Sequence, residues 1–314
     1  MNVIRTTPPR PVDVTAVFPQ LAPLARPAIR LHPRPGAPSP HDSSVGGPLL
    51  WPADEPWPHC HESHNQMDDL YEAYEVRASE DYEWHDGPNP MVPMAQLYVR
   101  DIPLLRPPGE ADLLQVLWCP FEHEPDYKPP TALFWRSSAA VTGTLGTPPG
   151  PFAVEYDGYI PRPCVLTPEQ ITEYPNSTDL SKELQQQLRD WSNWQAAGSA
   201  VDSSWAPYPD SFYGSELSVA PGWKVGGWPG WGLTDPIARF CTACGAKMAP
   251  LLTIASCEWD SSNMGWVPYE DQALGSLDDS CVANPPKVKV SRTNRLQLYV
   301  CPEYPDHPHT DLIQ

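Results

Sequence analysis

The chain has 314 residues, among them 43 prolines, 13 tryptophans and 13 tyrosines, and its formal net charge is −19 at pH 7. Its length suffices for two domains, and 40% hydrophobic residues argue against a chain that stays disordered despite its proline and charge. The charge disfavours nucleic acids and anionic membranes as partners and suits a basic protein or peptide, although solubility alone also explains it.

The start of the chain lacks the apolar core of a signal peptide, and no stretch reaches the roughly 20 apolar residues of a membrane span. We therefore expect a cytoplasmic protein that does not enter a membrane. In that compartment the eight cysteines are expected as metal ligands or buried thiols, not as disulfides.

In chain order, the proline-rich residues 1–44 are expected to form an irregular arm with a short helix near 13–24. Residues 67–86 are rich in acidic and tyrosine residues and are expected to be an exposed loop or frayed helix. Stretches rich in β-branched, aromatic or alternating apolar residues predict strands at 92–99, 113–120, 132–136, 250–259 and 288–301.

Two helices are predicted in the middle of the chain. Thr167, followed by Pro168 and an acidic residue, is typical of a helix N-terminus and predicts a short helix that ends before Tyr174. Residues 178–195 place leucines and tryptophans three and four positions apart, which predicts one longer amphipathic helix with this stripe in the core.

The sequence also matches itself. Residues 45–51 (VGGPLLW) correspond to residues 225–231 (VGGWPGW), and residues 114–120 (LQVLWCP) correspond to residues 296–302 (LQLYVCP). Ordered matches at offsets of about 180 residues indicate an internal repeat. We expect an α+β, mostly β fold of two pseudo-repeated halves: an arm (1–44), a first β-rich half (45–165), a helical connection and linker (166–221) and a second β-rich half (222–314).

A resemblance to known families rests on two groups of residues. The motif KVGGWP at 224–229, followed by Cys241-x-x-Cys244-Gly245 and a strand that ends in Cys301, resembles the opening domain of the programmed-cell-death-2 proteins. The motif GGPLLWP at 46–52 with MAQL at 94–97 is similar to the bacterial YwqG family of unknown function. The resemblance implies a pseudo-duplicated β fold and either chaperoning of a client protein or an immunity role beside a toxin. The first half of the chain has no CxxC motif, and in this it departs from the pattern of the eukaryotic programmed-cell-death-2 proteins.

The second half carries the clearest candidate site. Cys241 and Cys244, followed by Gly245, form a zinc-knuckle pattern, and the repeat brings Cys301 beside them. His307 or His309 would then complete a tetrahedral Cys3His site for a structural zinc ion. A free dithiol and a redox CxxC pair are the alternatives. A redox pair would favour a helix that begins at Cys241, and no helix is predicted there.

The first half offers a weaker second set of ligand types, namely Cys60, His64, Cys119 and His123, with Cys-x3-His spacing at both ends. The alternative is a group of polar loop histidines beside a buried cysteine. The remaining cysteines are expected to be packed thiols: Cys164, Cys257 and Cys281.

No catalytic motif (GxSxG, HExxH or a P-loop) is present. The sequence therefore favours a non-catalytic protein-binding protein of the immunity or client-chaperone type with a structural zinc ion. A metal-dependent enzyme that uses a His/Cys cluster is the alternative. The sequence does not predict the oligomeric state.

Overall fold

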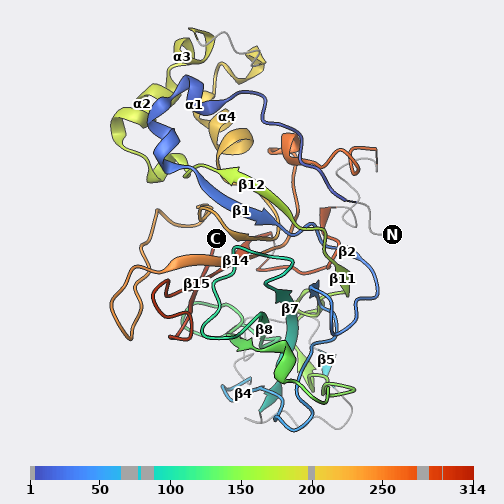
Figure 1. The fold of residues 1–314 in the computed structure, drawn as a ribbon. Helices are drawn as coiled ribbons and strands as arrows, with labels where there is room; N and C mark the ends of the chain where they lie inside the picture. The colour runs from blue at the N-terminus through green and yellow to red at the C-terminus, as the bar shows by residue number, and fades with distance from the viewer. Residues whose placement is uncertain (1–3, 65–76, 79–87, 197–201, 274–282, 292) are drawn as a thin grey trace. The chain divides into compact units, whose positions relative to one another are not determined.

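The computed structural model describes residues 4–64, 77–78, 88–196, 202–273, 283–291 and 293–314 (Figure 1). The chain divides into two units. The terminal unit comprises residues 1–32, 167–284 and 295–314, and the middle unit comprises residues 33–166 and 285–294. The fold is mostly β with few helices, as predicted. Within the described ranges, no helix has both the length and the apolar character needed to cross a membrane.

The terminal unit is built on a six-stranded antiparallel sheet with the order β12-β1-β13-β14-β15-β16. Its strands are β1 (Arg26–Arg30), β12 (Glu169–Glu173), β13 (Lys224–Gly226), β14 (Ala249–Ala255), β15 (Arg295–Val300) and β16 (Thr310–Ile313). Strand β1 comes from the segment that was expected to be an irregular arm. It is ordered because Ala28 and Ile29 are buried and because it pairs with a strand on each side.

The α-helices of the terminal unit gather on one side of β1 and β12 (Figure 1). They are α1 (Val14–Val17), α2 (Lys182–Arg189), α3 (Trp191–Ala196) and α4 (Pro209–Phe212). The helical segment predicted at 178–195 is present as a 3-10 turn followed by α2 and α3, because Asp190 adopts an extended conformation between the two helices. Its Leu184, Leu188 and Trp194 lie in the core, as predicted.

Short 3-10 and π turns add to the helical content of the described residues. They are η1 (Pro19–Leu24), η2 (Ser138–Ala140), η3 (Asp157–Tyr159), η4 (Ser177–Asp179), η5 (Ser203–Trp205), η6 (Tyr213–Ser218, a π turn) and η7 (Met264–Trp266).

The helix predicted to begin at Thr167 is wrong, because residues 169–173 form strand β12. Each of its residues pairs with a residue of β1, from Glu169 opposite Arg30 to Glu173 opposite Arg26. The local signal, an N-cap threonine followed by proline, is overridden by pairing with a strand about 140 residues earlier in the chain.

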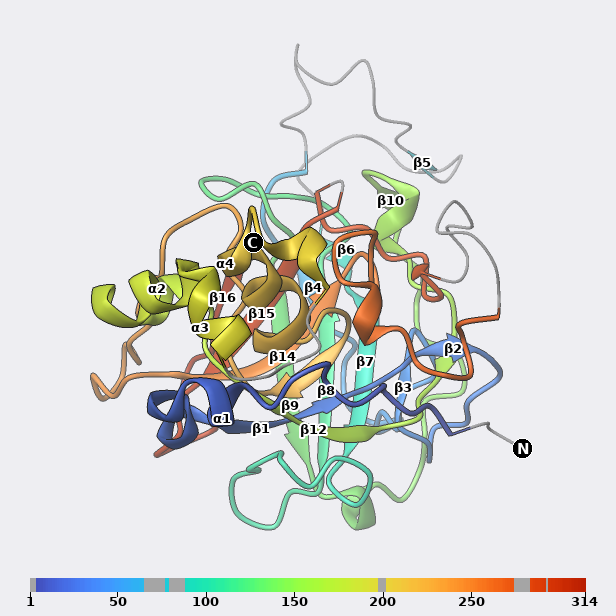
Figure 2. The same cartoon turned by 90° about the horizontal axis from the view of Figure 1, so that it is seen from above.

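The middle unit has its own six-stranded antiparallel sheet, with the order β2-β11-β3-β7-β8-β9, in which β7, β8 and β9 lie side by side (Figure 2). Its strands are β2 (Arg34–Pro35), β3 (Ser44–Val45), β7 (Val92–Tyr98), β8 (Leu113–Trp118), β9 (Thr131–Arg136) and β11 (Cys164–Val165). Two small ladders pair β4 (His59–Cys60) with β6 (Asn89–Pro90) and β5 (Arg77–Ala78) with β10 (Ala153–Val154). Apart from β5, the acidic segment 67–86 lies outside the described residues.

The two sheets share an arrangement of strands. The run β3-β7-β8-β9 in the middle unit and the run β13-β14-β15-β16 in the terminal unit are both antiparallel and follow the chain in the same order. Each second strand has an irregularity at its start, between Pro93 and Ala95 in β7 and between Pro250 and Leu252 in β14. A cysteine follows each third strand directly: Cys119 after β8 and Cys301 after β15.

Candidate metal centres

In the middle unit, four cysteine and histidine side chains converge at one end of β8. Cys60 ends β4, and His64 follows four residues later; Cys119 comes directly after β8, and His123 lies in the turn that follows. Their ligand atoms all lie within 4.8 Å of one another. The structure thus brings together the weaker set of the sequence analysis.

The distances within this cluster suit a tetrahedral zinc ion. The Nε2 atoms of His64 and His123 lie 3.3 Å and 3.4 Å from Sγ of Cys119, and Nε2 of His123 lies 3.7 Å from Sγ of Cys60. Zinc bonds of about 2.3 Å to sulfur and about 2.0 Å to nitrogen, at tetrahedral angles, imply a sulfur–nitrogen separation of about 3.6 Å. No donor has to move far to reach a shared ion.

The cluster is enclosed by protein. All four residues are buried, at most 8% exposed, and the two cysteines belong to an apolar core that includes Trp57, Met91 and Phe121. The other ring nitrogen of His123, Nδ1, lies 3.2 Å from a carboxylate oxygen of Glu62. A carboxylate behind a ligand histidine fixes the orientation of its ring, and the sequence analysis did not single out this residue.

The two thiols of the middle cluster differ in acidity. Hydrogen bonds from Cys119, His123 and His64 lower the pKa of Cys60, whereas burial raises the pKa of Cys119. The protein alone therefore favours one thiolate and one thiol. A divalent cation would favour deprotonation of both, because the thiolate is the ligand form.

In the terminal unit, a knuckle holds the CxxC pair. The backbone N–H of Gly245 donates to the carbonyl of Cys241, the N–H of Cys241 donates to the carbonyl of Ala246, and Phe240 forms a bridge with Lys247. Gly245 has φ +74°, a left-handed conformation that favours glycine. The tight turn places Cys241 and Cys244 on the same side, as the motif predicted.

Cys301 and His307 complete this second cluster. Sγ of Cys301 lies 3.5 Å from Sγ of Cys244, close to the separation of about 3.8 Å expected for two sulfur ligands of one zinc ion. Nδ1 of His307 lies 3.4 Å from Sγ of Cys241. The cluster contains His307 and not His309. Unlike the middle cluster, it is open on one side, because Cys244 is exposed and His307 is half-buried.

Acidity is again uneven among the thiols. Burial acts to raise the pKa of Cys241, but hydrogen bonds from the amides of Cys244 and Ala243 lower it to about 6. The amide of Ala246 acts to lower the pKa of Cys244, but partial desolvation by the surrounding protein and the neighbouring Cys301 and Cys241 raise it. Backbone amides that point at sulfur are what a zinc knuckle requires, so the turn is prepared for a thiolate ligand.

The other cysteines lie outside both clusters. Cys164 is buried in β11, Cys257 is half-buried after β14, and Cys281 lies outside the described residues. Within the described parts of the chain, these two clusters are the groups of cysteine, histidine and acidic side chains able to share an ion.

The two clusters differ in the net charge that each would have with a zinc ion bound. A zinc ion with the Cys2His2 set of the middle unit would be neutral overall, whereas one with the Cys3His set of the terminal unit would carry one negative charge. Each set supplies four protein ligands, the number found in structural zinc sites, whereas catalytic sites commonly supply three and keep a position for water.

No family model matches the chain, and no curated protein shows significant similarity to it.

Proposed function

We propose that the chain is a non-catalytic protein-binding protein, of the immunity or client-chaperone type, in which one structural zinc ion stabilises each unit. One observation carries the proposal: each unit gathers four cysteine and histidine donors within 4.8 Å of one another. Both groups use the end of a corresponding strand, β8 or β15. Four protein ligands around zinc leave no position for a reacting water molecule.

Two further observations support this proposal. The shared strand order, the matching irregularities and the equivalent cysteines favour descent of both units from one ancestral unit, in line with the resemblance to the YwqG and programmed-cell-death-2 families. The net charge of −19 favours a basic protein as the partner. Thiolate ligands need a reducing compartment, which favours the cytoplasm.

A metal-dependent enzyme is the second candidate, and the openness of the terminal cluster is what favours it. Exposed Cys244 and half-buried His307 would let a small molecule approach an ion there. An enzyme would require one of the four ligands to leave or to be replaced by water.

Elemental analysis of the purified chain separates the two candidates. Two zinc ions per chain that stay bound through dialysis without a chelator would support the structural proposal. A single loosely held ion with a coordinated water would contradict it and support the enzyme.

A further inference from the structure

A groove in the terminal unit lies beside the edge strand β12. It has a volume of about 440 Å³, within the range of about 300–1,000 Å³ for ligand sites. One wall is the segment 7–14, and the other is β12 with Tyr174. Apolar side chains also line it: Val12 from the segment 7–14, and Leu217 and Trp266 from two other parts of the unit.

The hydrogen bonds of β1 show which backbone groups of β12 point outward. The carbonyl of Pro27 accepts from the N–H of Gly227 at 3.1 Å, and Leu31, directly after β1, donates its N–H to the carbonyl of Trp223 at 2.9 Å. The odd-numbered residues of β1 therefore bond toward β13. The even-numbered residues therefore bond toward β12, where their partners are residues 169, 171 and 173. It follows that Gln170 and Thr172 direct their N–H and C=O groups away from the sheet.

The neighbouring contact agrees with this alternation. Tyr174 is the next residue of the outward set, and its N–H donates to the carbonyl of Ser218 at 3.1 Å. No described residue makes a backbone hydrogen bond with Gln170 or Thr172 on the outward side. β12 thus presents two donors and two acceptors at the two-residue spacing that an added strand requires.

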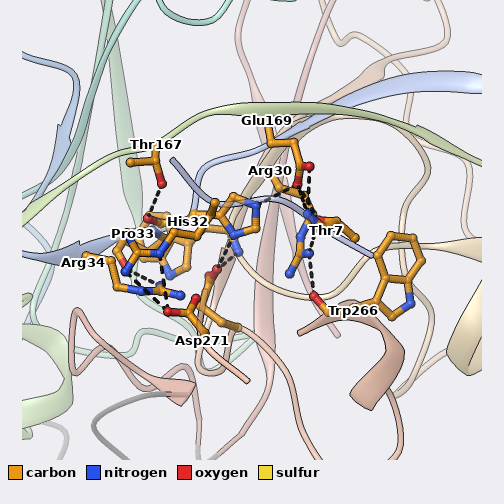
Figure 3. A network of polar contacts seen from close by, with 12 residues as sticks. Thr7, Arg30, His32, Pro33, Arg34, Thr167, Glu169, Trp266 and Asp271 are labelled. Atoms are coloured by element: carbon orange, nitrogen blue, oxygen red, sulfur yellow. Dashed lines mark hydrogen bonds and ion pairs between the residues drawn. The ribbon is translucent and has the colours of Figure 1, made fainter. Parts of the chain in front are cut away.

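The charged side chains of the groove are largely occupied by the protein itself. The carboxylate of Glu169 accepts from the N–H and hydroxyl of Thr7 and contacts His32 (Figure 3). The guanidinium of Arg10 donates to three backbone carbonyls and lies 3.7 Å from the ring centre of Trp266. Asp13, which caps α1, stays exposed.

The remaining features select the kind of occupant. The free groups belong to the backbone, and the walls are partly apolar. The lining includes two carboxylates, Glu169 and Asp13, and one guanidinium, Arg10, in a chain of net charge −19. A small anion would find no free cationic donor among these lining side chains. An extended peptide with apolar and cationic side chains matches the backbone groups, the walls and the charge.

We propose that an extended, cationic peptide segment of a partner protein binds this groove and adds a strand to the β12 edge through Gln170 and Thr172. The inference rests on the protein-binding function proposed above and names the surface and the chemistry of the partner. It does not require either metal centre.

The test uses a labelled synthetic peptide, acetyl-Lys-Val-Thr-Val-Lys-amide, and fluorescence anisotropy with the full chain. We expect saturable binding, and binding at least about tenfold weaker for Thr172→Pro, which removes an outward N–H without removing a hydrogen bond to β1. Thr172→Val keeps the backbone and is the matched control, with affinity within about twofold of the wild type.

Two altered peptides keep the test decisive if Thr172→Pro fails to fold. A peptide N-methylated at its valines cannot donate these backbone hydrogen bonds and should bind at least about tenfold more weakly. A peptide with glutamate in place of lysine should also lose affinity. Equal binding of the N-methylated peptide, or no saturable binding of the parent peptide, would overturn the inference.

Measuring zinc in the same preparation separates this inference from the metal centres. If the chain contains two zinc ions but does not bind the peptide, the proposal for the groove is wrong and the proposal for the metal centres stands. A zinc-free, folded chain that binds the peptide with the expected dependence on Thr172 would support the groove while contradicting the metal centres.

Discussion

Cys60 and Cys119 are 59 positions apart in the sequence, yet their side chains belong to one buried cluster with His64 and His123. Burying four such groups without a shared ion would leave polar atoms with only weak sulfur–nitrogen contacts, at a cost in free energy. With an ion, each of these side chains has a strong bond. The middle centre therefore depends on every one of the four residues.

Replacing Cys60 by serine should reduce the zinc content from two ions to one per chain. The free energy of unfolding should fall by roughly 3 kcal/mol or more, because the energy of metal binding contributes to folding. Elemental analysis and denaturant unfolding measure both. Cys164→Ser, at a buried cysteine outside both clusters, is the matched control and should keep two ions. Two retained ions in Cys60→Ser would contradict the assignment.

His32 is a buried histidine outside both metal clusters, and its side chain lies close to two carboxylates. It is fully buried with φ +46°, and its Nε2 lies 3.1 Å from an oxygen of Glu169 (Figure 3). Its Nδ1 lies 3.8 Å from an oxygen of Glu258. Burial lowers the pKa of His32, although the hydrogen bond to Glu169 opposes the shift, and nearby Arg30 lowers it further. His32 is therefore neutral in the folded protein at neutral pH.

This lowered pKa predicts a pH dependence of stability. Below about pH 6.5 the unfolded chain protonates His32 while the folded chain does not, so the contribution of this residue to stability decreases as the pH falls. His32→Gln should be less stable than the wild type at pH 7.5, and the difference should narrow by pH 5.5. Urea unfolding at the two pH values tests this. A difference that widens on acidification would show that the pKa is raised instead.

At the scale of elements, one ion pair joins strands on both sides of β1. Nζ of Lys224 on β13 lies 2.6 Å and 2.7 Å from the carboxylate oxygens of Glu173 on β12, and it also donates to the carbonyl of Trp228. The carboxylate also accepts from the amides of Ala220 and Trp228. Both side chains are buried, and the positive charge of Lys224 is paired with the negative charge of Glu173.

Lys224→Met should destabilise the terminal unit by about 3–5 kcal/mol, because it leaves Glu173 buried and charged without its partner. Lys182→Met, the same change at an exposed position of α2, should alter stability by less than about 0.5 kcal/mol. Denaturant unfolding of the two variants decides the matter. Equal stability of the two variants would contradict the account.

The two metal-binding loops differ in exposure, and this predicts a difference in exchange. A chelator should remove zinc in two phases of equal amplitude, the faster one from the terminal cluster with its exposed Cys244. Cys244→Ser should abolish the fast phase and leave the slow one. A single phase in the wild type, or a fast phase that survives in Cys244→Ser, would contradict the prediction.

The sequence predicted those elements whose signal is local. Strands β7, β8 and β9 follow apolar runs, and the CxxC knuckle is visible as a motif. The approach of Cys301 to the knuckle was predicted only by aligning the chain with itself. β12 and β1 were missed because each is a strand only through its pairing with a distant segment, and the break at Asp190 left no local signal.

At the scale of the molecule, the account depends on two zinc ions held entirely by the chain. The clusters offer five sulfur and three nitrogen ligands in total. Neither set requires a water ligand. This composition distinguishes structural sites from a catalytic one.

X-ray absorption at the zinc edge of the purified chain tests that claim most directly. The account predicts two four-coordinate zinc ions per chain with, on average, more sulfur ligands at about 2.3 Å than nitrogen or oxygen ligands at about 2.0 Å. A chain purified without zinc, or zinc with more nitrogen or oxygen ligands than sulfur ligands, would contradict it.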